Sequence, residues 1–281
     1  MRIEKLDSFL PNKEVSVNVA NIVSGNLIIV DRFLVYLEEH KRSILGDFIV
    51  NLTSKYKSLI SSGMEKINTI IFKETLEKSL ILKNNINLAK TVVSLVFSVL
   101  KVNIDYYEEN LEIKRTQLEI SRAWLLSRIY FSELLAEMIN RDEAIQFLKD
   151  YFVYYANNHR KIAKHEDLNS VFESDIEGGR KNDNNLGVSV LIDNKIYASR
   201  VDRCMAPEAL TDYNDSEIKH IVCCSADHAI VRNTNKNFVL TRTSTLMDGP
   251  YCDFCCHDTR YVEKIEHPPR EFYEKLNKVE N

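Results

Sequence analysis

The feature that most constrains the fold is a long stretch of chain without helix-breaking residues. Between about residue 25 and residue 165 there is no proline, and only Gly46 and Gly63 follow the glycine at its edge, Gly25. Proline and glycine are the residues that most strongly disfavour a helix. Apolar side chains here recur every three to four residues, as in Leu126, Ile129, Leu134 and Leu135, and then in Ala144, Phe147, Leu148, Tyr151 and Phe152. This period predicts a bundle of four to six amphipathic helices.

Polar positions predict the breaks between these helices, near residues 61–63, 84–87 and 140–142. The run "TVVSLVFSVLKV", which begins at Thr91, is rich in β-branched residues and favours a strand by propensity alone. Because helical segments flank this run on both sides, we expect a buried helix instead.

The character of the chain changes after residue 165. Residues 166–186 are polar and contain Gly178–Gly179, which predicts a linker or a long loop. Asp193–Asn194 then separates two strand-like runs, as in a hairpin. Two further runs, "IKHIVCCSADHAIV" and "NFVLTRTSTLM", are candidate strands, and a short helix is expected after Pro207. The sequence thus predicts an α+β fold, with a helical region at 1–165, a linker at 166–186 and a small antiparallel sheet domain at 187–281.

Charge and hydropathy exclude several classes of partner. The net charge of −4 gives no basic face for nucleic acid or for an anionic membrane. The N-terminus has charges throughout, so no signal peptide is expected. The longest uncharged apolar run, Thr91 to Leu100, is about half of what a membrane span needs. We expect a cytoplasmic protein that acts on a small molecule, and the apolar stripes of the helical half are suited to pairing two chains as a homodimer.

All six cysteines lie between Cys204 and Cys256, three of them in the run "GPYCDFCCHDTR". Such clustering in a chain of intracellular character indicates a metal site, a reactive thiol or small buried side chains. The Cys-x-x-Cys spacing is half of a zinc knuckle, and the ligand set for that alternative is Cys252, Cys255, His257 and Cys223.

A reactive thiol needs a base or a cation nearby to favour the thiolate. If the run is a strand, Cys252, Phe254 and Cys256 face one side, and Asp253, Cys255 and His257 face the other. A base for Cys252 is therefore expected from elsewhere in the sheet. Candidates on neighbouring strands are Asp227, His228 and Arg242, and an arginine such as Arg203 or Arg242 can bind a substrate carboxylate with two hydrogen bonds.

Several ordered motifs resemble the L-2-amino-thiazoline-4-carboxylic acid hydrolase family. The run "RTSTLMDGPYCDFCC" is similar to the family's signature, and "VDRCMAPEALTDYNDSEIKHIVCCSADHAIV" is similar to its upstream segment. The resemblance covers roughly residues 120 to 260 and falls on Arg203, Cys204, Cys223, Cys224, Asp227, Arg242, Thr243, Thr245, Gly249, Cys252, Asp253 and Phe254. The family run usually continues with an arginine where this chain has Cys255. The Cys-x-x-Cys is therefore peculiar to this chain, which argues against a shared metal motif.

The resemblance implies hydrolysis of a non-peptide carbon–nitrogen bond in a cyclic amidine, with the thiazoline ring opened to a carbamoyl-cysteine and no cofactor. It implies catalytic roles for Cys252 as nucleophile and for Asp227 and Asp253 as carboxylates that orient groups or activate water. Substrate binding would then fall to Arg203, Arg242, Thr243, Cys224 and His228. Two alternatives remain from the sequence: a sensor module that binds a small molecule or a metal, and a natural-product tailoring enzyme that closes or opens a ring on the same fold.

Overall fold

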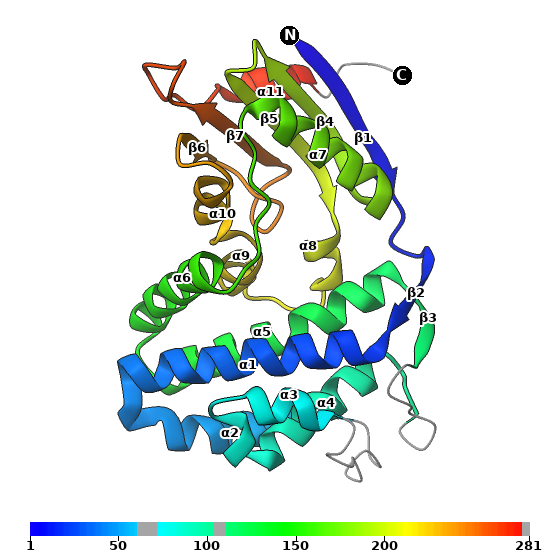
Figure 1. Ribbon diagram of the computed structural model, residues 1–281, viewed down its shortest axis with the longest axis vertical. Helices are drawn as coiled ribbons and strands as arrows, with labels where there is room; N and C mark the ends of the chain where they lie inside the picture. The colour runs from blue at the N-terminus through cyan, green and yellow to red at the C-terminus, as the bar shows by residue number, and fades with distance from the viewer. Residues whose placement is uncertain (61–71, 104–110, 277–281) are drawn as a thin grey trace. The chain divides into compact units, whose positions relative to one another are not determined.

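The computed structural model describes residues 1–60, 72–103 and 111–276 (Figure 1). The chain forms two compact units. The helical unit is Asn12–Tyr151, and the sheet unit combines Met1–Pro11 with Phe152–Asn281. Helices followed by an antiparallel sheet confirm the predicted α+β class.

The helical unit contains α1 (Val19–Lys41), α2 (Leu45–Ser58), α3 (Lys73–Lys78), α4 (Ile86–Val99), α5 (Gln117–Met138) and most of α6 (Arg141–Asn158). Short 3₁₀ turns lie at Arg42–Ile44 and Leu82–Asn84, and strands β2 (Glu14–Asn18) and β3 (Glu112–Thr116) pair antiparallel. The breaks predicted near 84–87 and 140–142 are confirmed, and the one near 61–63 lies outside the described residues. The β-branched run at Thr91 is the buried helix α4, as predicted.

Aromatic rings form much of the core of the helical unit. Phe33 stacks on Phe131 with ring centroids 4.1 Å apart, and Tyr151 meets Phe33 edge-on at 5.1 Å. The aromatic residues of α6 that the sequence places on one stripe therefore pack in the core.

Helix α5 starts at a capping box, in which the side chains of Thr116 and Glu119 each accept a hydrogen bond from the other residue's backbone N–H.

One helical stretch, Val19–Ser58, is long and apolar enough to cross a membrane by length and composition. The most apolar part of it has a mean hydropathy of 1.4, and 61% of that part is buried inside the protein. The core helices of soluble proteins meet the same criterion.

Gly25 allows α1 and α5 to approach each other closely. A Cβ added at Gly25 would lie 2.1 Å from a ring carbon of Trp124, so alanine there must displace the indole. We expect Gly25→Ala to lower the free energy of unfolding by about 2 kcal/mol, a common cost of overpacking. Urea unfolding followed by the fluorescence of Trp124, the only tryptophan of the chain, measures this loss. In the control, Gly46→Ala, the new Cβ meets nothing within 4 Å, so its stability should be unchanged or slightly higher.

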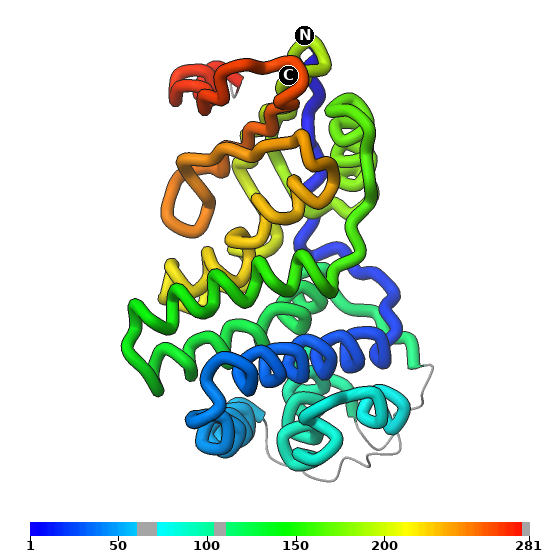
Figure 2. The backbone as a smooth tube through the Cα atoms, turned by 60° about the vertical axis from the view of Figure 1, so that its left-hand side comes forward, coloured from blue at the N-terminus to red at the C-terminus, as the bar shows by residue number. Residues whose placement is uncertain are grey.

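The sheet unit is built on five antiparallel strands in the order β1-β4-β5-β7-β6, which Figure 1 labels. Figure 2 shows β1, at the blue end of the chain, beside segments that come after residue 165. Their bounds are Arg2–Phe9 for β1, Asn184–Ile192 for β4, Ile196–Cys204 for β5, Phe238–Thr241 for β6 and Cys252–Asp258 for β7. The hairpin turn between β4 and β5 lies at Asp193 and Asn194, which have positive φ angles of 51° and 56°. Asp and Asn tolerate this left-handed conformation, and the predicted hairpin is confirmed.

The linker predicted at 166–186 is wrong over most of its length, because helix α7 occupies Leu168–Asn182. Asp167 caps its N-terminus, and Leu168, Phe172 and Ile176 are buried at helical spacing. The two glycines that suggested a loop are tolerated because Leu168, Phe172 and Ile176 of the same helix pack on the sheet. Gly179 is even favoured there, since a Cβ would lie 2.9 Å from the Leu6 side chain of β1.

The strand predicted over "IKHIVCCSADHAIV" is also wrong. That segment forms helices α9 (Ser216–Cys224) and α10 (Asp227–Thr234), and Asp215 caps the first of them. The buried residues Ile218, Ile221 and Val222 follow the helical period rather than the alternation of a strand. Only Phe238–Thr241 of the other candidate strand is extended, and α8 (Met205–Ala209) is the short helix expected near Pro207.

Candidate active site

A cavity of about 420 Å³ lies on one face of the five-stranded sheet. Helices α7, α8, α9 and α10 and the loop after β6 contribute the rest of its wall, and all of these segments belong to the sheet unit. The lining residues that carry polar or sulfur-containing side chains are Ser174, Asp175, Asn182, Asn184, Asn185, Tyr197, Ser199, Cys204, Cys223, Cys224, Asp227, Arg242, Met247 and Cys252.

One row of paired residues crosses four strands beneath this cavity. Leu6 of β1 pairs with Gly187 of β4, Gly187 with Val201 of β5, and Val201 with Cys252 of β7. Residues paired across antiparallel strands point to the same face. Leu6, Val201 and Cys252 all line the cavity, so this row is part of its floor. Position 187 has to be glycine, because a Cβ there would lie 2.0 Å from the backbone oxygen of Arg200.

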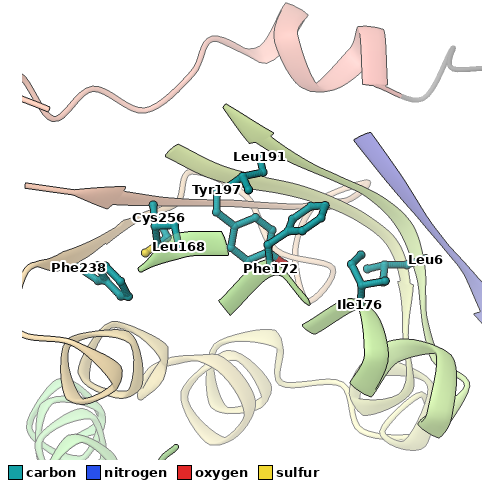
Figure 3. Packing of buried hydrophobic residues seen from close by; sticks show 8 residues of the cluster. All are labelled: Leu6, Leu168, Phe172, Ile176, Leu191, Tyr197, Phe238 and Cys256. Atoms are coloured by element: carbon teal, nitrogen blue, oxygen red, sulfur yellow. The ribbon is translucent and has the colours of Figure 1, made fainter. Parts of the chain in front are cut away.

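The predicted alternation along β7 is confirmed. Cys252 and Phe254 line the cavity, and Cys256 joins an apolar cluster on the same face of the sheet. Figure 3 shows that cluster, with Tyr197 between Leu6 on one side and Cys256 and Phe238 on the other. Cys255 packs in a second cluster on the opposite face.

Cys252 is the cavity thiol with the most defined surroundings. Its Sγ accepts a hydrogen bond of 3.2 Å from the backbone N–H of Leu246. Burial raises the pKa of Cys252 above its ordinary value, while the Leu246 N–H and the positive charge of Arg242 act in the opposite direction. The charge of Asp227 raises this pKa further. The thiol is thus protonated at rest, with two groups placed to stabilise the thiolate once it forms.

Arg242 and Asp227 form an ion pair in the wall beside this thiol. Nη2 of Arg242 donates to Oδ2 of Asp227 at 2.9 Å, and the two side chains are 11% and 29% exposed. Nε of Arg242 is buried and has no hydrogen-bond partner among the described residues. Asp227 begins helix α10, and not a strand as predicted, but the fold still brings it to Arg242. The pair thus offers both a cation and a carboxylate to a bound molecule.

Three more thiols line the cavity: Cys204, Cys223 and Cys224. Burial raises the pKa of Cys204 to about 11 and raises that of Cys224 still more strongly. The charges of Asp227 and Cys252 oppose ionisation of both, and that of Arg242 favours it. These two thiols are therefore harder to ionise and form weaker candidates for a nucleophile. Cys224, predicted to bind substrate, does reach the cavity.

Asp253 points away from the cavity and does not meet Cys252, although the two are adjacent in sequence. Its Oδ1 accepts from the backbone N–H groups of Thr243 and Ser244 at 2.7 and 2.8 Å, and its Oδ2 accepts from the Thr243 hydroxyl. Nε2 of His267 lies 3.2 Å from the same Oδ2. Burial opposes ionisation, but these hydrogen bonds hold the pKa of Asp253 below its ordinary value. Asp253 therefore fixes the loop that carries Leu246, which is a structural role.

Three residues predicted to bind substrate lie outside the cavity lining. Arg203 donates to Glu208 at 2.8 Å and stacks over the ring of Phe9 at 4.3 Å. Thr243 is engaged by Asp253, and His228 is exposed on α10. Of the two arginines proposed for a substrate carboxylate, only Arg242 reaches the cavity.

The alternative zinc ligands do not converge. Cys252 and Cys223 line the cavity, whereas Cys255 and His257 lie on the other face of β7. Within residues 1–60, 72–103 and 111–276, no group of three His, Cys, Asp or Glu side chains is placed to hold a metal ion.

Asp175 and Tyr197 are lining residues that the sequence did not indicate as part of a site. Tyr197 was part of a predicted strand, but no motif marked its side chain. Asp175 lay in the predicted linker, where the i, i+4 spacing of Leu168, Phe172 and Ile176 was the available signal for a helix.

A thiol beside an arginine–aspartate pair, in a cavity large enough for a small molecule, is an arrangement suited to chemistry on a small substrate. The family model of L-2-amino-thiazoline-4-carboxylic acid hydrolase matches residues 119–256, nearly half of the chain. This segment contains every candidate catalytic residue named above, and its match to the family model confirms the resemblance that the motifs indicated. No curated protein and no solved structure matches the chain. The family name indicates a hydrolase.

Proposed function

We propose that the protein opens the ring of L-2-amino-thiazoline-4-carboxylate, or of a closely related cyclic amidine, with Cys252 as the nucleophile. The observation that carries this proposal is the position of Cys252 in the lining of the cavity. Its Sγ accepts a hydrogen bond from the Leu246 N–H, and the charges of the Arg242–Asp227 ion pair act on its pKa.

The reacting carbon is C2 of the thiazoline, which bears two nitrogens and one sulfur and is electrophilic like an amidinium carbon. The Cys252 thiolate adds to C2, one ring bond breaks, and water then adds to C2 and releases Cys252 as the leaving group. Departure of the ring sulfur leaves both nitrogens on C2 and gives N-carbamoyl-cysteine with a free thiol. Departure of the ring nitrogen gives the S-carbamoyl isomer with a free amine. Each route consumes one water molecule, and only the second breaks the carbon–nitrogen bond that the family resemblance suggested.

The two members of the ion pair in the wall each have a role in this scheme. Arg242 binds the substrate carboxylate through its unpaired Nε–H and stabilises the Cys252 thiolate. Asp227 holds Arg242 in place and accepts the proton of the thiol. In the non-covalent alternative, Asp227 activates water directly and Cys252 only shapes the cavity.

The direct test is to incubate the purified protein with L-2-amino-thiazoline-4-carboxylate and follow the substrate by mass spectrometry. We expect a product heavier by one water, and a thiol reagent then separates the two isomers, since only N-carbamoyl-cysteine has a free thiol. If folded protein leaves the compound unchanged, this substrate is excluded. A product without a free thiol supports cleavage of the carbon–nitrogen bond.

The rate should depend on pH in the way a buried thiol dictates. Burial raises the pKa of Cys252, so the thiolate fraction of free enzyme is small at neutral pH and grows as the pH increases. We expect kcat/KM to rise about tenfold per pH unit above about pH 7 and to level off only above the pKa of roughly 8.5 of an unperturbed cysteine. The titration of the substrate itself has to be measured separately and subtracted. A profile that is flat between about pH 7 and pH 9 would count against a thiolate nucleophile.

A further inference from the structure

Strand β7 carries a second polar cluster on the face opposite the cavity. Asp253 and His257 face that side together with Cys255. Thr241 of β6 faces it as well, because it pairs with Cys255. Oγ1 of Thr241 lies 3.1 Å from Nε2 of His257 and 3.0 Å from Nδ1 of His267. Nε2 of His267 in turn lies 3.2 Å from Oδ2 of Asp253, so the row of contacts ends at a carboxylate.

His267 comes from a part of the chain beyond the family match, which ends at residue 256. It precedes helix α11 (Arg270–Leu276), which packs against β5 (Figure 1). The His267 ring stacks on the fully buried ring of Tyr273, with centroids 5.3 Å apart and planes at 15°. Two prolines directly after His267 restrict the backbone there. Stacking on α11 and the contact at Nδ1 thus fix the ring, with Nε2 turned to the Asp253 carboxylate.

The contact between His267 and Asp253 is electrostatic. Nε2 of His267 is buried and makes no hydrogen bond among the described residues, although Oδ2 of Asp253 lies 3.2 Å away. The two side chains are 14% and 3% exposed, so water and salt screen them little. The charge of His267 favours the ionised form of Asp253 and contributes to its lowered pKa. Arg200 pairs with Asp253 across the sheet, but its guanidinium donates to Asp202 and to the Tyr273 carbonyl instead.

Asp253 connects this contact to the loop between β6 and β7. Its carboxylate accepts from the N–H groups of Thr243 and Ser244, and its own N–H donates to the Ser244 carbonyl at 3.2 Å. Leu246 follows two residues later and donates its N–H to Sγ of Cys252. The loop is therefore held at two adjacent residues of β7, by a carboxylate on one face and a thiol on the other.

We infer that His267 is a positioning residue for the Cys252 thiol: it orients the Asp253 carboxylate, which holds the loop so that the Leu246 N–H meets the sulfur. This inference rests on the proposed function only for the catalytic role of the thiol, because the state of the thiol can be measured without turnover. It gives the chain beyond the family match a part in the site.

The test is the pH dependence of Cys252 alkylation by iodoacetamide on the full chain, with peptide mass spectrometry to assign the label. His267→Asn keeps a polar group near the place of Nδ1 and removes the one that faces Asp253. We expect the profile to shift to higher pH by about one unit, which slows alkylation roughly tenfold at neutral pH, as for a lost hydrogen bond to a charged group.

His267→Gln is the matched control, because the amide nitrogen of glutamine takes the place of Nε2. Its profile should stay close to that of the wild type. If circular dichroism shows that His267→Asn is unfolded, His267→Phe, which keeps the ring stacked on Tyr273, replaces it with the same expected shift. In the Asp253→Asn background, His267→Asn should have no further effect, since the two residues act in one series.

The outcomes separate this role from the proposed reaction. An unchanged profile in folded His267→Asn or His267→Phe overturns the inference. Equal shifts in the Asn and Gln variants also overturn it, because they assign the effect to the ring and not to Nε2. A further shift in the Asp253→Asn background overturns the route through Asp253. If the expected shifts occur but the wild-type protein hydrolyses no thiazoline, the positioning role stands and the proposed reaction fails.

Discussion

Cys252→Ala should lower kcat/KM for ring opening by roughly 10⁴-fold or more, the scale seen when a covalent nucleophile is removed. The Cys252 thiol lines the cavity, and its Sγ accepts a hydrogen bond from the Leu246 N–H. Alanine removes the sulfur that would bond to C2 and leaves the rest of the lining intact. The measurement is the steady-state rate of ring opening by mass spectrometry. Thermal unfolding of both proteins shows whether the variant is folded.

The matched control for this prediction is Cys255→Ala. Cys255 lies on the same strand but on the opposite face, fully buried in a separate apolar cluster, and burial raises its pKa to about 12. We expect that variant to lose some stability and to keep its activity per folded molecule. If Cys252→Ala retains a tenth or more of the wild-type rate, the nucleophile is not Cys252, and water activated by Asp227 becomes the better mechanism.

Strand alternation was the strongest guide that the sequence offered to the site. The rule that neighbours on a strand face opposite sides predicted that Cys252 and Phe254 share a face and that Cys255 does not, and the structure confirms both. The same rule places Asp253 away from the thiol. Although Asp253 and Cys252 are adjacent in the motif, the carboxylate of Asp253 binds the loop at Thr243 and Ser244 and does not reach the thiol.

Helices that packing stabilises were the hardest part to predict. Gly178–Gly179 indicated a loop by propensity, yet α7 is held by apolar contacts of Leu168, Phe172 and Ile176 with the sheet. Propensity is a weak signal when tertiary contacts oppose it. Because α7 was missed, Asp175 could not be placed in the wall of the cavity. The position of Asp227 beside Arg242 likewise depends on α10, which the sequence suggested as a strand.

The second large expected loss of activity concerns the Arg242–Asp227 ion pair. Arg242→Gln removes the cation that the proposal assigns to the substrate carboxylate, and it leaves Asp227 without its partner in a partly buried wall. We expect kcat/KM to fall roughly 10²- to 10³-fold, mainly through KM, because losing one member of such a pair costs both the contact and the desolvation of the other. Stability should fall by about 1 to 3 kcal/mol, less than for a fully buried pair since Asp227 is 29% exposed.

A readout that a merely structural role would not move is the pKa of Cys252, because the two members of the pair act on it with opposite signs. The charge of Arg242 lowers that pKa and the charge of Asp227 raises it. Arg242→Gln should therefore shift the pH dependence of Cys252 alkylation by iodoacetamide to higher pH, and Asp227→Asn should shift it to lower pH. Peptide mass spectrometry assigns the label to Cys252 and not to the other cavity thiols. Shifts of the same sign in both variants would mean that the substitutions disturb the wall as a whole, whereas opposite shifts identify the pair as the electrostatic control of the thiol.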